Sequence, residues 1–189
     1  MASNLSKYTA WAITLAAIGG AWLLSRRKGS IPSLITREDG TIMKNYFGDK
    51  EFTYSETAKK YGIDNTPDDL AWQHIHELRD YVLNPAREQL GYPVYITSGY
   101  RSKALNSFVG GASNSQHQTG EAADITTKNH ARNRELFAIL AQMGNFDQLI
   151  WEKGGEWIHV SFRPSGRGQM LAYDGSKYTN INNNWQNIV

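Results

Sequence analysis

Cysteine is absent from this 189-residue chain, and its absence excludes several kinds of chemistry. Disulfides, thiolate zinc sites and cysteine nucleophiles cannot occur, and the redox state of the compartment is left open. A metal bound to this protein must therefore be held by histidine, aspartate or glutamate.

The chain also lacks a strong charge of either sign. The net charge is +2, and residues 1–30 contain Lys7, Arg26, Arg27 and Lys28 but no acidic residue. Those four cations leave a net charge of −2 on the rest of the chain. Because the rest has no basic stripe and no nucleic-acid-binding motif, we expect no nucleic-acid partner.

A long apolar run occurs once, near the N-terminus. Residues 8–24 (YTAWAITLAAIGGAWLL) carry no charge, and the basic cluster at 26–28 follows them. This length is at the short end of what a helix needs to cross roughly 30 Å of hydrocarbon. We expect residues 1–30 to be a retained membrane anchor. A helix lying on or in a protein surface and a cleaved signal peptide remain alternatives, although signal peptides carry their charge before the apolar run.

The remaining residues are numerous enough for one domain with a buried core but too few for two domains of typical size. Residues 31–50 mix glycine, proline, serine and charge without a sustained period, which predicts a linker. Residues 51–189 are then the globular domain, and we expect it to be a monomer.

Three helices are predicted in this domain from their caps and apolar periods. The first is capped by Ser55 and ends at Gly62. The second begins at 66–69 (TPDD) and ends near Asn84 and Pro85. The third is capped by Asn129 and closed by Gly144. In the second helix, we expect a buried face made by Leu70, Ile75, Leu78 and Val82.

Strands are predicted at residues 94–97, 122–126 and 157–162. Helices that precede a small sheet, with one further helix inserted between strands, predict an α+β fold with a small antiparallel sheet and flanking helices. The polar tail after Tyr178 is expected to be an ordered surface extension, because it contains Trp185.

Two of the five histidines occur where they could share a metal. His117 lies in a polar turn before the predicted strand 122–126, Asp124 lies within that strand, and His159 lies in the strand 157–162. Two imidazoles and one carboxylate suit a catalytic zinc that keeps its fourth position for water. A single His and Asp pair would more often be structural. For His74, His76 and His130 we expect only packing or surface roles.

Two further residues could act beside such a metal. Glu156 precedes His159 by three positions, so strand alternation would send their side chains to opposite faces. A bend at Gly154 and Gly155 would be needed for Glu156 to act as a general base. Arg101 follows the strand 94–97 and could stabilise the oxyanion of a tetrahedral intermediate.

Three motifs together resemble the peptidase M15 family of zinc D-Ala-D-Ala carboxypeptidases, including its short phage and bacterial cell-wall members. They are Ser-Gly-Tyr-Arg at 98–101, Ser-x-His-x-x-Gly-x-Ala-x-Asp at 115–124, and Glu-x-x-His at 156–159. The resemblance runs from about residue 52 to about 178 and does not cover the predicted anchor. It implies the zinc fold shared by D,D-peptidases and Hedgehog proteins, preceded here by an N-terminal hydrophobic helix.

The same resemblance implies roles for individual residues. Zn²⁺ would be held by His117, Asp124 and His159. Glu156 would be the catalytic base and Arg101 would stabilise the substrate carbonyl. Ser115, Gln118 and Tyr100 are expected to line the substrate site.

The implied activity is hydrolysis of a peptide bond in peptidoglycan stem peptides. Family members include D,D-carboxypeptidases, D,D-dipeptidases and L-Ala-D-Glu endopeptidases, and the shared motifs leave the bond open. The alternative is a non-catalytic, membrane-tethered zinc module that binds the cell wall. A base beside the metal speaks against that alternative.

The expected location is the membrane, with the catalytic domain facing the periplasm and cell wall, as in a phage lysis enzyme. The positive-inside rule conflicts with this orientation, because it would keep the cluster at 26–28, and the domain behind it, in the cytoplasm. A marginal segment that inserts and is later released would resolve the conflict.

Overall fold

The computed structural model describes residues 44–187. The predicted anchor at 1–30 and most of the predicted linker at 31–50 lie outside the described residues. Within residues 44–187, no helix is both long enough and apolar enough to cross a membrane.

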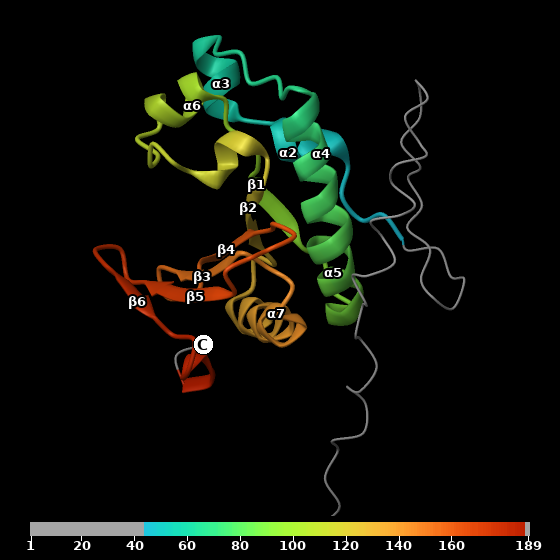
Figure 1. Ribbon diagram of the computed structural model, residues 1–189, viewed down its shortest axis with the longest axis vertical. Helices are drawn as coiled ribbons and strands as arrows, with labels where there is room; N and C mark the ends of the chain where they lie inside the picture. Colours follow the sequence, from blue (N-terminus) through green and yellow to red (C-terminus); the bar gives the residue numbers. More distant parts are fainter. Residues whose placement is uncertain (1–43, 188–189) are drawn as a thin grey trace, which may run out of the picture. The chain divides into compact units, whose positions relative to one another are not determined.

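Helices occupy the first half of the described chain, and strands dominate the second half (Figure 1). The helical elements are α2 (Asp49–Thr53), α3 (Glu56–Tyr61), α4 (Asp69–Leu78), the π-helical segment η3 (Arg79–Leu83), α5 (Asn84–Leu90), α6 (Lys103–Phe108), the 3-10 segment η4 (Gln116–Thr119), α7 (His130–Met143) and η5 (Trp185–Asn187). The strands are β1 (Tyr95–Ser98), β2 (Ala122–Thr126), β3 (Gln148–Glu152), β4 (Trp157–Ser161), β5 (Gln169–Tyr173) and β6 (Tyr178–Asn180).

The six strands form one sheet in the order β1-β2-β4-β3-β5-β6. All neighbouring pairs are antiparallel except β3 and β5, which run parallel. The α+β prediction is confirmed, but the prediction of a purely antiparallel sheet is wrong. After β4, the chain crosses over and adds β5 on the far side of β3, so β5 runs in the same direction as β3.

Two of the three predicted helices end where their caps indicated. Ser55 accepts a hydrogen bond from the backbone N–H of Ala58, and α3 stops at Gly62 in the left-handed conformation. Asn129 accepts one from the N–H of Arg132, and α7 stops at left-handed Gly144. These caps satisfy backbone groups that the helices leave free at their ends.

The second helix does not end near Asn84 and Pro85, as was predicted. It continues from α4 through η3 into α5 and stops at Gly91. Pro85 lies in the first turn of α5, where a missing N–H group is tolerated, and the wider π turn lets Asn84 N–H donate to the carbonyl of Arg79. On the predicted face, Ile75, Leu78 and Val82 are buried but Leu70 is 59% exposed.

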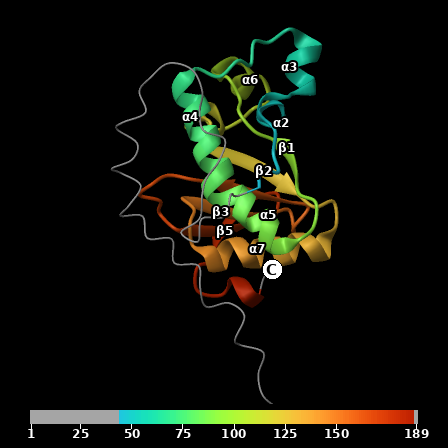
Figure 2. The ribbon, with the colours of Figure 1, turned by 90° about the vertical axis from the view of Figure 1, so that its right-hand side faces the viewer.

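The core fills the space between one face of the sheet and the long helices. Figures 1 and 2 show the rod formed by α4, η3 and α5 running beside the sheet and α7 lying close to the strands. Side chains from α4 and η3, α7 and the strands make this core, including Ile75, Leu78, Val82, Leu136, Phe137, Leu140, Ile125, Leu149, Ile158 and Val160. Phe47, which lies in the range predicted as a linker, is also part of the core.

The C-terminal tail forms part of the sheet and of the buried core. Tyr178–Asn180 pairs with β5 as strand β6, and Ile181 is fully buried. Trp185 packs on Phe137, with 6.2 Å between the ring centroids. The expected ordered extension is therefore present and also supplies an edge strand.

Candidate metal centre

Three side chains from separate parts of the chain converge on one point beside the sheet. The distance from Nε2 of His117 to Nδ1 of His159 is 3.2 Å, and from Nε2 of His117 to Oδ1 of Asp124 it is 3.3 Å. Nδ1 of His159 lies 3.0 Å from the same Oδ1. The fold thus brings together the three residues that the sequence proposed as ligands.

Strand pairing explains why these residues meet. Asp124 on β2 and His159 on β4 are direct partners across the antiparallel pair, so their side chains share one face. That face is opposite the core, because Ile158 and Val160 point into the core from the positions between. His117 reaches the pair from η4, the turn that leads into β2.

The ring of His117 is oriented by a second contact. Its Nδ1 atom lies 2.7 Å from the carbonyl oxygen of Gly99, and the side chain is buried. A carbonyl only accepts, so Nδ1 carries the proton and Nε2 presents its lone pair to the cluster. This is the arrangement expected of a metal-binding histidine.

The approach of His117 to Gly99 depends on a residue without a side chain. A Cβ atom on Gly99 would lie 2.3 Å from the carbonyl oxygen of Phe52, and the N–H of Tyr100 donates to that same oxygen. The backbone at residues 99–100 is therefore held against Phe52, and the carbonyl of Gly99 points toward His117.

The separations within the cluster match a tetrahedral metal. Zinc bonds of about 2.0–2.1 Å at tetrahedral angles place neighbouring ligand atoms ~3.3 Å apart. The three distances of 3.0–3.3 Å correspond to three edges of such a tetrahedron. Two imidazole nitrogens and one carboxylate oxygen therefore fit zinc in both chemistry and spacing.

Asp124 divides its two oxygens between the cluster and Arg101. Oδ1 faces the two imidazoles, while Oδ2 accepts a hydrogen bond of 2.8 Å from Nη2 of Arg101. Burial alone would raise the pKa of Asp124, but the imidazoles of His117 and His159 outweigh it and hold the pKa well below its ordinary value. Asp124 is thus an ionised carboxylate ready to bind a cation.

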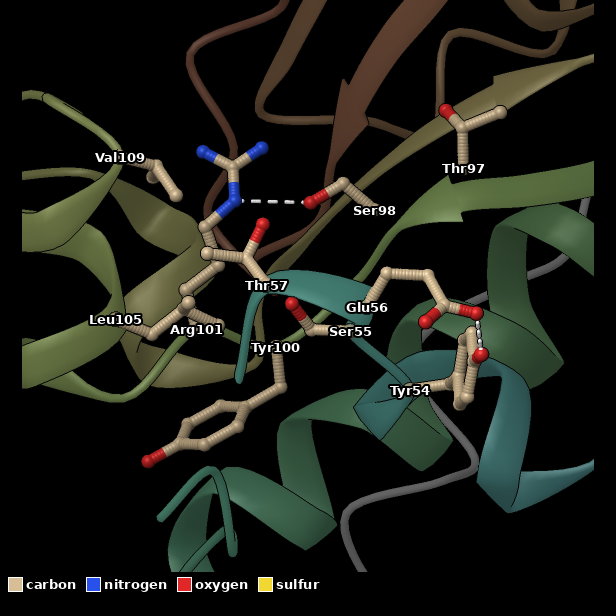
Figure 3. Close-up of a pocket in the computed structure, with 10 residues that line it drawn as sticks. All are labelled: Tyr54, Ser55, Glu56, Thr57, Thr97, Ser98, Tyr100, Arg101, Leu105 and Val109. Carbon is tan, nitrogen blue, oxygen red and sulfur yellow. Dashed lines mark hydrogen bonds between the residues drawn. The ribbon is translucent and has the colours of Figure 1, made fainter. Parts of the chain in front are cut away.

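A shift in strand register precedes Arg101. The register between β1 and β2 shifts so that Ser98 lies opposite Asp124. Ser98 Oγ accepts a hydrogen bond of 2.8 Å from Nε of Arg101 (Figure 3). Nε and Nη2 are engaged, and Nη1 has no hydrogen-bond partner within residues 44–187.

A pocket of about 460 Å³ opens beside Arg101. Figure 3 shows its lining: residues at the start of α3, the end of β1, and the apolar side chains of Leu105 and Val109. Tyr100 and Arg101 both line it, and the ring of Tyr100 points away from the guanidinium of Arg101. Burial raises the pKa of Tyr100.

The other two predicted lining residues lie in the loop before β2. The amide of Gln118 donates to the carbonyls of Ala112 and Ser113, which ties the loop to itself. The backbone N–H of Ser115 donates to the Ala112 carbonyl. Neither side chain forms a hydrogen bond with the three converging residues.

Glu156 forms no hydrogen bond with the three converging residues. Its side chain is exposed and forms no hydrogen bond with any described residue, and its backbone carbonyl accepts from Thr126 and Asn133. Glu156 lies just before β4, next to the turn at 153–155 with its positive φ angles, and its role as the catalytic base stays a prediction.

A different carboxylate, Glu152, lies on the face of the cluster. In the pairing of β3 with β4, Ile150 is opposite His159 and Glu152 is opposite Trp157, so Glu152 shares the face of His159. Sequence reasoning missed it because the strand 148–152 was not predicted. The only available signal was the alternation of Gln148, Ile150 and Glu152 with the core residues Leu149 and Trp151.

The remaining histidines lie apart from the cluster. His74 contacts the carbonyl of Thr119, His76 pairs with Asp49, and Nε2 of His130 contacts the carbonyl of Gly154. Each has a structural contact, in agreement with the expectation of packing and surface roles.

Comparison with known families matches the part of the chain that builds this centre. A family model described as Peptidase M15 matches residues 45–161, which is more than half of the chain. A search of curated proteins gives no match. The matched range contains all three converging residues and Arg101, and the chain belongs to the peptidase M15 family.

Proposed function

We propose that this protein is a zinc peptidase that hydrolyses a peptide bond in peptidoglycan stem peptides. Membership of the family implies a metallopeptidase. The observation that carries the proposal is the tetrahedral spacing of His117 Nε2, Asp124 Oδ1 and His159 Nδ1. Three protein ligands leave the fourth zinc position open, which is typical of catalytic rather than structural sites.

The bound zinc would supply Lewis-acid activation of the peptide carbonyl and of a water molecule. The protein contributes the remaining steps. Glu156, the predicted base, takes a proton from the attacking water, whose oxygen forms a bond to the carbonyl carbon. The same group returns the proton to the leaving amine as the C–N bond breaks.

Arg101 is suited to stabilise the negative charge that develops on the carbonyl oxygen. Its Nε and Nη2 atoms are held by Ser98 and Asp124, so the guanidinium is fixed in place before a substrate arrives. A fixed donor of this kind loses no reorganisation energy during the reaction. The pocket beside it, lined in part by Tyr100, is where we place the substrate peptide.

Product analysis on purified peptidoglycan tests this function. The full-length protein, loaded with zinc, is expected to release fragments that mass spectrometry identifies, and dipicolinate should stop release until zinc is restored. Released D-alanine would indicate a carboxypeptidase, and a new N-terminal D-glutamate would indicate an endopeptidase. Hydrolysis of free D-Ala-D-Ala, without release of fragments from peptidoglycan, would indicate a dipeptidase. Zinc binding near one per chain without any product would favour the non-catalytic wall-binding module, and neither zinc nor product would refute both.

We also propose that residues 1–30 hold the enzyme at a membrane, with the domain facing the cell wall. The support is the uncharged run 8–24 and the basic cluster after it. The full-length protein should stay with membranes through carbonate extraction, and protease added to intact spheroplasts should cut the domain. Release by high salt alone would contradict the anchor, and protection in spheroplasts would contradict the orientation.

A further inference from the structure

A row of four side chains, which we call the aromatic row, crosses the face of the sheet that carries the metal centre. Glu152 on β3 is the direct partner of Trp157 on β4 and of Tyr173 on β5. Tyr173 in turn pairs with Tyr178 on β6. Because Trp157 and His159 are two positions apart on β4, the row lies on the face of His159. Strands β5 and β6, which carry its outer half, follow the range matched by the family model (Figure 1).

Glu152 is the acid within this row, and it has no polar partner. Its exposed fraction is only 8%, and its carboxylate forms no hydrogen bond or ion pair with any residue between 44 and 187. Burying a carboxylate without compensation costs free energy. A buried acceptor of this kind calls for an explanation, and a donor brought by a ligand supplies one.

The rings around Glu152 determine which donor suits it. Tyr173 and Tyr178 stack with 4.5 Å between their ring centroids, and Tyr178 is 57% exposed. The Nζ atom of Lys153 lies 5.3 Å from the centroid of the Trp157 ring, so the row already attracts one ammonium group. Lys153 forms no ion pair with Glu152, which leaves the carboxylate for a ligand. Aromatic faces beside a carboxylate favour a cationic donor over a neutral one.

The order of the strands places the aromatic row and the pocket beside Arg101 on opposite sides of the metal centre. Arg101 follows β1, Asp124 and His159 lie on β2 and β4, and the row runs outward over β3, β5 and β6. A peptide that extends from the pocket across the metal centre can therefore reach Glu152 with a side chain.

We infer that the aromatic row is a subsite for a cationic side-chain amine of the substrate peptide, as a diamino acid residue of a peptidoglycan stem supplies. Glu152 accepts hydrogen bonds from the ammonium group, and the rings of Trp157 and Tyr178 contact it. The inference rests on the proposed function and gives the row a role in specificity. A peptide without the amine loses these contacts and leaves the buried acid unpaired.

Binding of two matched peptides tests the inference. One is a synthetic stem pentapeptide with lysine as its diamino acid, and the other is the same peptide with the lysine amine acetylated. Calorimetry on the full-length, chelator-treated protein should give a Kd about 10–100-fold lower for the free amine. E152Q should keep the wild-type Kd for the acetylated peptide and lose the preference. E135Q, on the exposed surface of α7 where Glu135 pairs with Arg132, should keep the preference.

Y178A tests the row without changing a buried residue. Loss of the exposed ring should leave the unfolding temperature unchanged and raise the Kd of the free-amine peptide by about 2–5-fold, because a cation–π contact is lost. Y92A, which removes an exposed tyrosine that follows α5, should leave that Kd unchanged.

Three results would overturn the inference. They are equal Kd values for the two peptides in the wild type, a preference for the free amine that survives in E152Q, and an equal loss of binding of both peptides in E152Q. Hydrolysis by the zinc-loaded protein tests the proposed function separately. A wild type that prefers the free amine in binding but cleaves neither peptide nor peptidoglycan would refute the peptidase and leave the amine subsite in place.

Discussion

Arg101 donates from Nη2 to Oδ2 of Asp124 at 2.8 Å, while the other oxygen of Asp124 faces both histidines. One guanidinium is therefore joined to a candidate metal ligand and also lines the pocket. It can influence zinc binding through Asp124 and the reaction through its free Nη1 atom. These two effects can be separated by experiment.

We predict that R101A lowers both zinc affinity and turnover. Loss of a residue that supports a ligand costs about 10–100-fold in metal affinity. Loss of a donor to the developing oxyanion costs roughly 10²–10³ in rate. Zinc titration gives the first effect, and the rate at saturating zinc gives the second.

S98A is the matched variant for this test. It removes only the hydrogen bond to Nε of Arg101 and leaves the guanidinium on Asp124. We expect a smaller loss of rate than in R101A and unchanged zinc affinity. A normal rate in R101A at full zinc occupancy would remove Arg101 from the reaction.

We predict that H117A abolishes stoichiometric zinc binding. His117 supplies one of three ligands, so its loss leaves only the pair on the sheet. In the wild type, zinc at 1,000 times its Kd should stabilise the fold by about 4 kcal/mol, because it binds the folded state alone. Metal analysis and thermal unfolding with and without zinc measure both effects. H130A, an exposed histidine outside the cluster, should keep both, and full zinc occupancy in H117A would refute the assignment.

A pH-dependent contribution to stability is expected from Asp147. Burial alone would raise its pKa, but hydrogen bonds from the guanidinium and backbone N–H of Arg167 lower it below the ordinary value. A lowered pKa in the folded state means that the stabilisation is present above the unfolded pKa and is lost as pH falls through the folded pKa. The loss should therefore occur below about pH 4.

D147N removes the charge and should flatten this dependence. The uncharged amide at position 147 would leave Arg167 without its ionised partner. We therefore expect the free energy of unfolding to fall by about 1–3 kcal/mol near neutral pH. The difference in unfolding temperature between wild type and D147N should shrink as pH falls from 6 to 3. A difference that stays constant over that range would contradict the role of this pair.

Local signals in the sequence predicted the elements whose ends are determined by local chemistry. Ser55, Asn129, Gly62 and Gly144 bound their helices as expected, because caps and left-handed glycines act within one turn. The prediction ended the second helix too early, at Asn84 and Pro85. A π turn accommodates this proline, and such a turn depends on tertiary contacts rather than on local preference.

The candidate ligands could be predicted because two of them occur in strands with clear alternation. The approach of Asp124 to His159 follows directly from the pairing of β2 with β4. The position of Glu152 could not be predicted in the same way. It depends on the pairing of β3 with β4, and the strand at 148–152 was not predicted.

The last prediction concerns the backbone contact that orients His117. A methyl group on residue 99 would lie 2.3 Å from the carbonyl oxygen of Phe52, so G99A must move either strand end or helix α2. Overpacking of this kind costs typically about 1–3 kcal/mol. Because the Gly99 carbonyl accepts from Nδ1 of His117, zinc affinity should fall together with stability.

G62A serves as the comparison for G99A. Gly62 ends α3 with φ of +62°, and a Cβ atom there would meet nothing within 4 Å. The expected cost of G62A is roughly 1 kcal/mol of backbone strain, with no change in zinc affinity. Zinc titration and denaturant unfolding of the two variants measure both quantities. A G99A protein that loses stability but binds zinc as tightly as the wild type would show that the contact with Gly99 does not position His117.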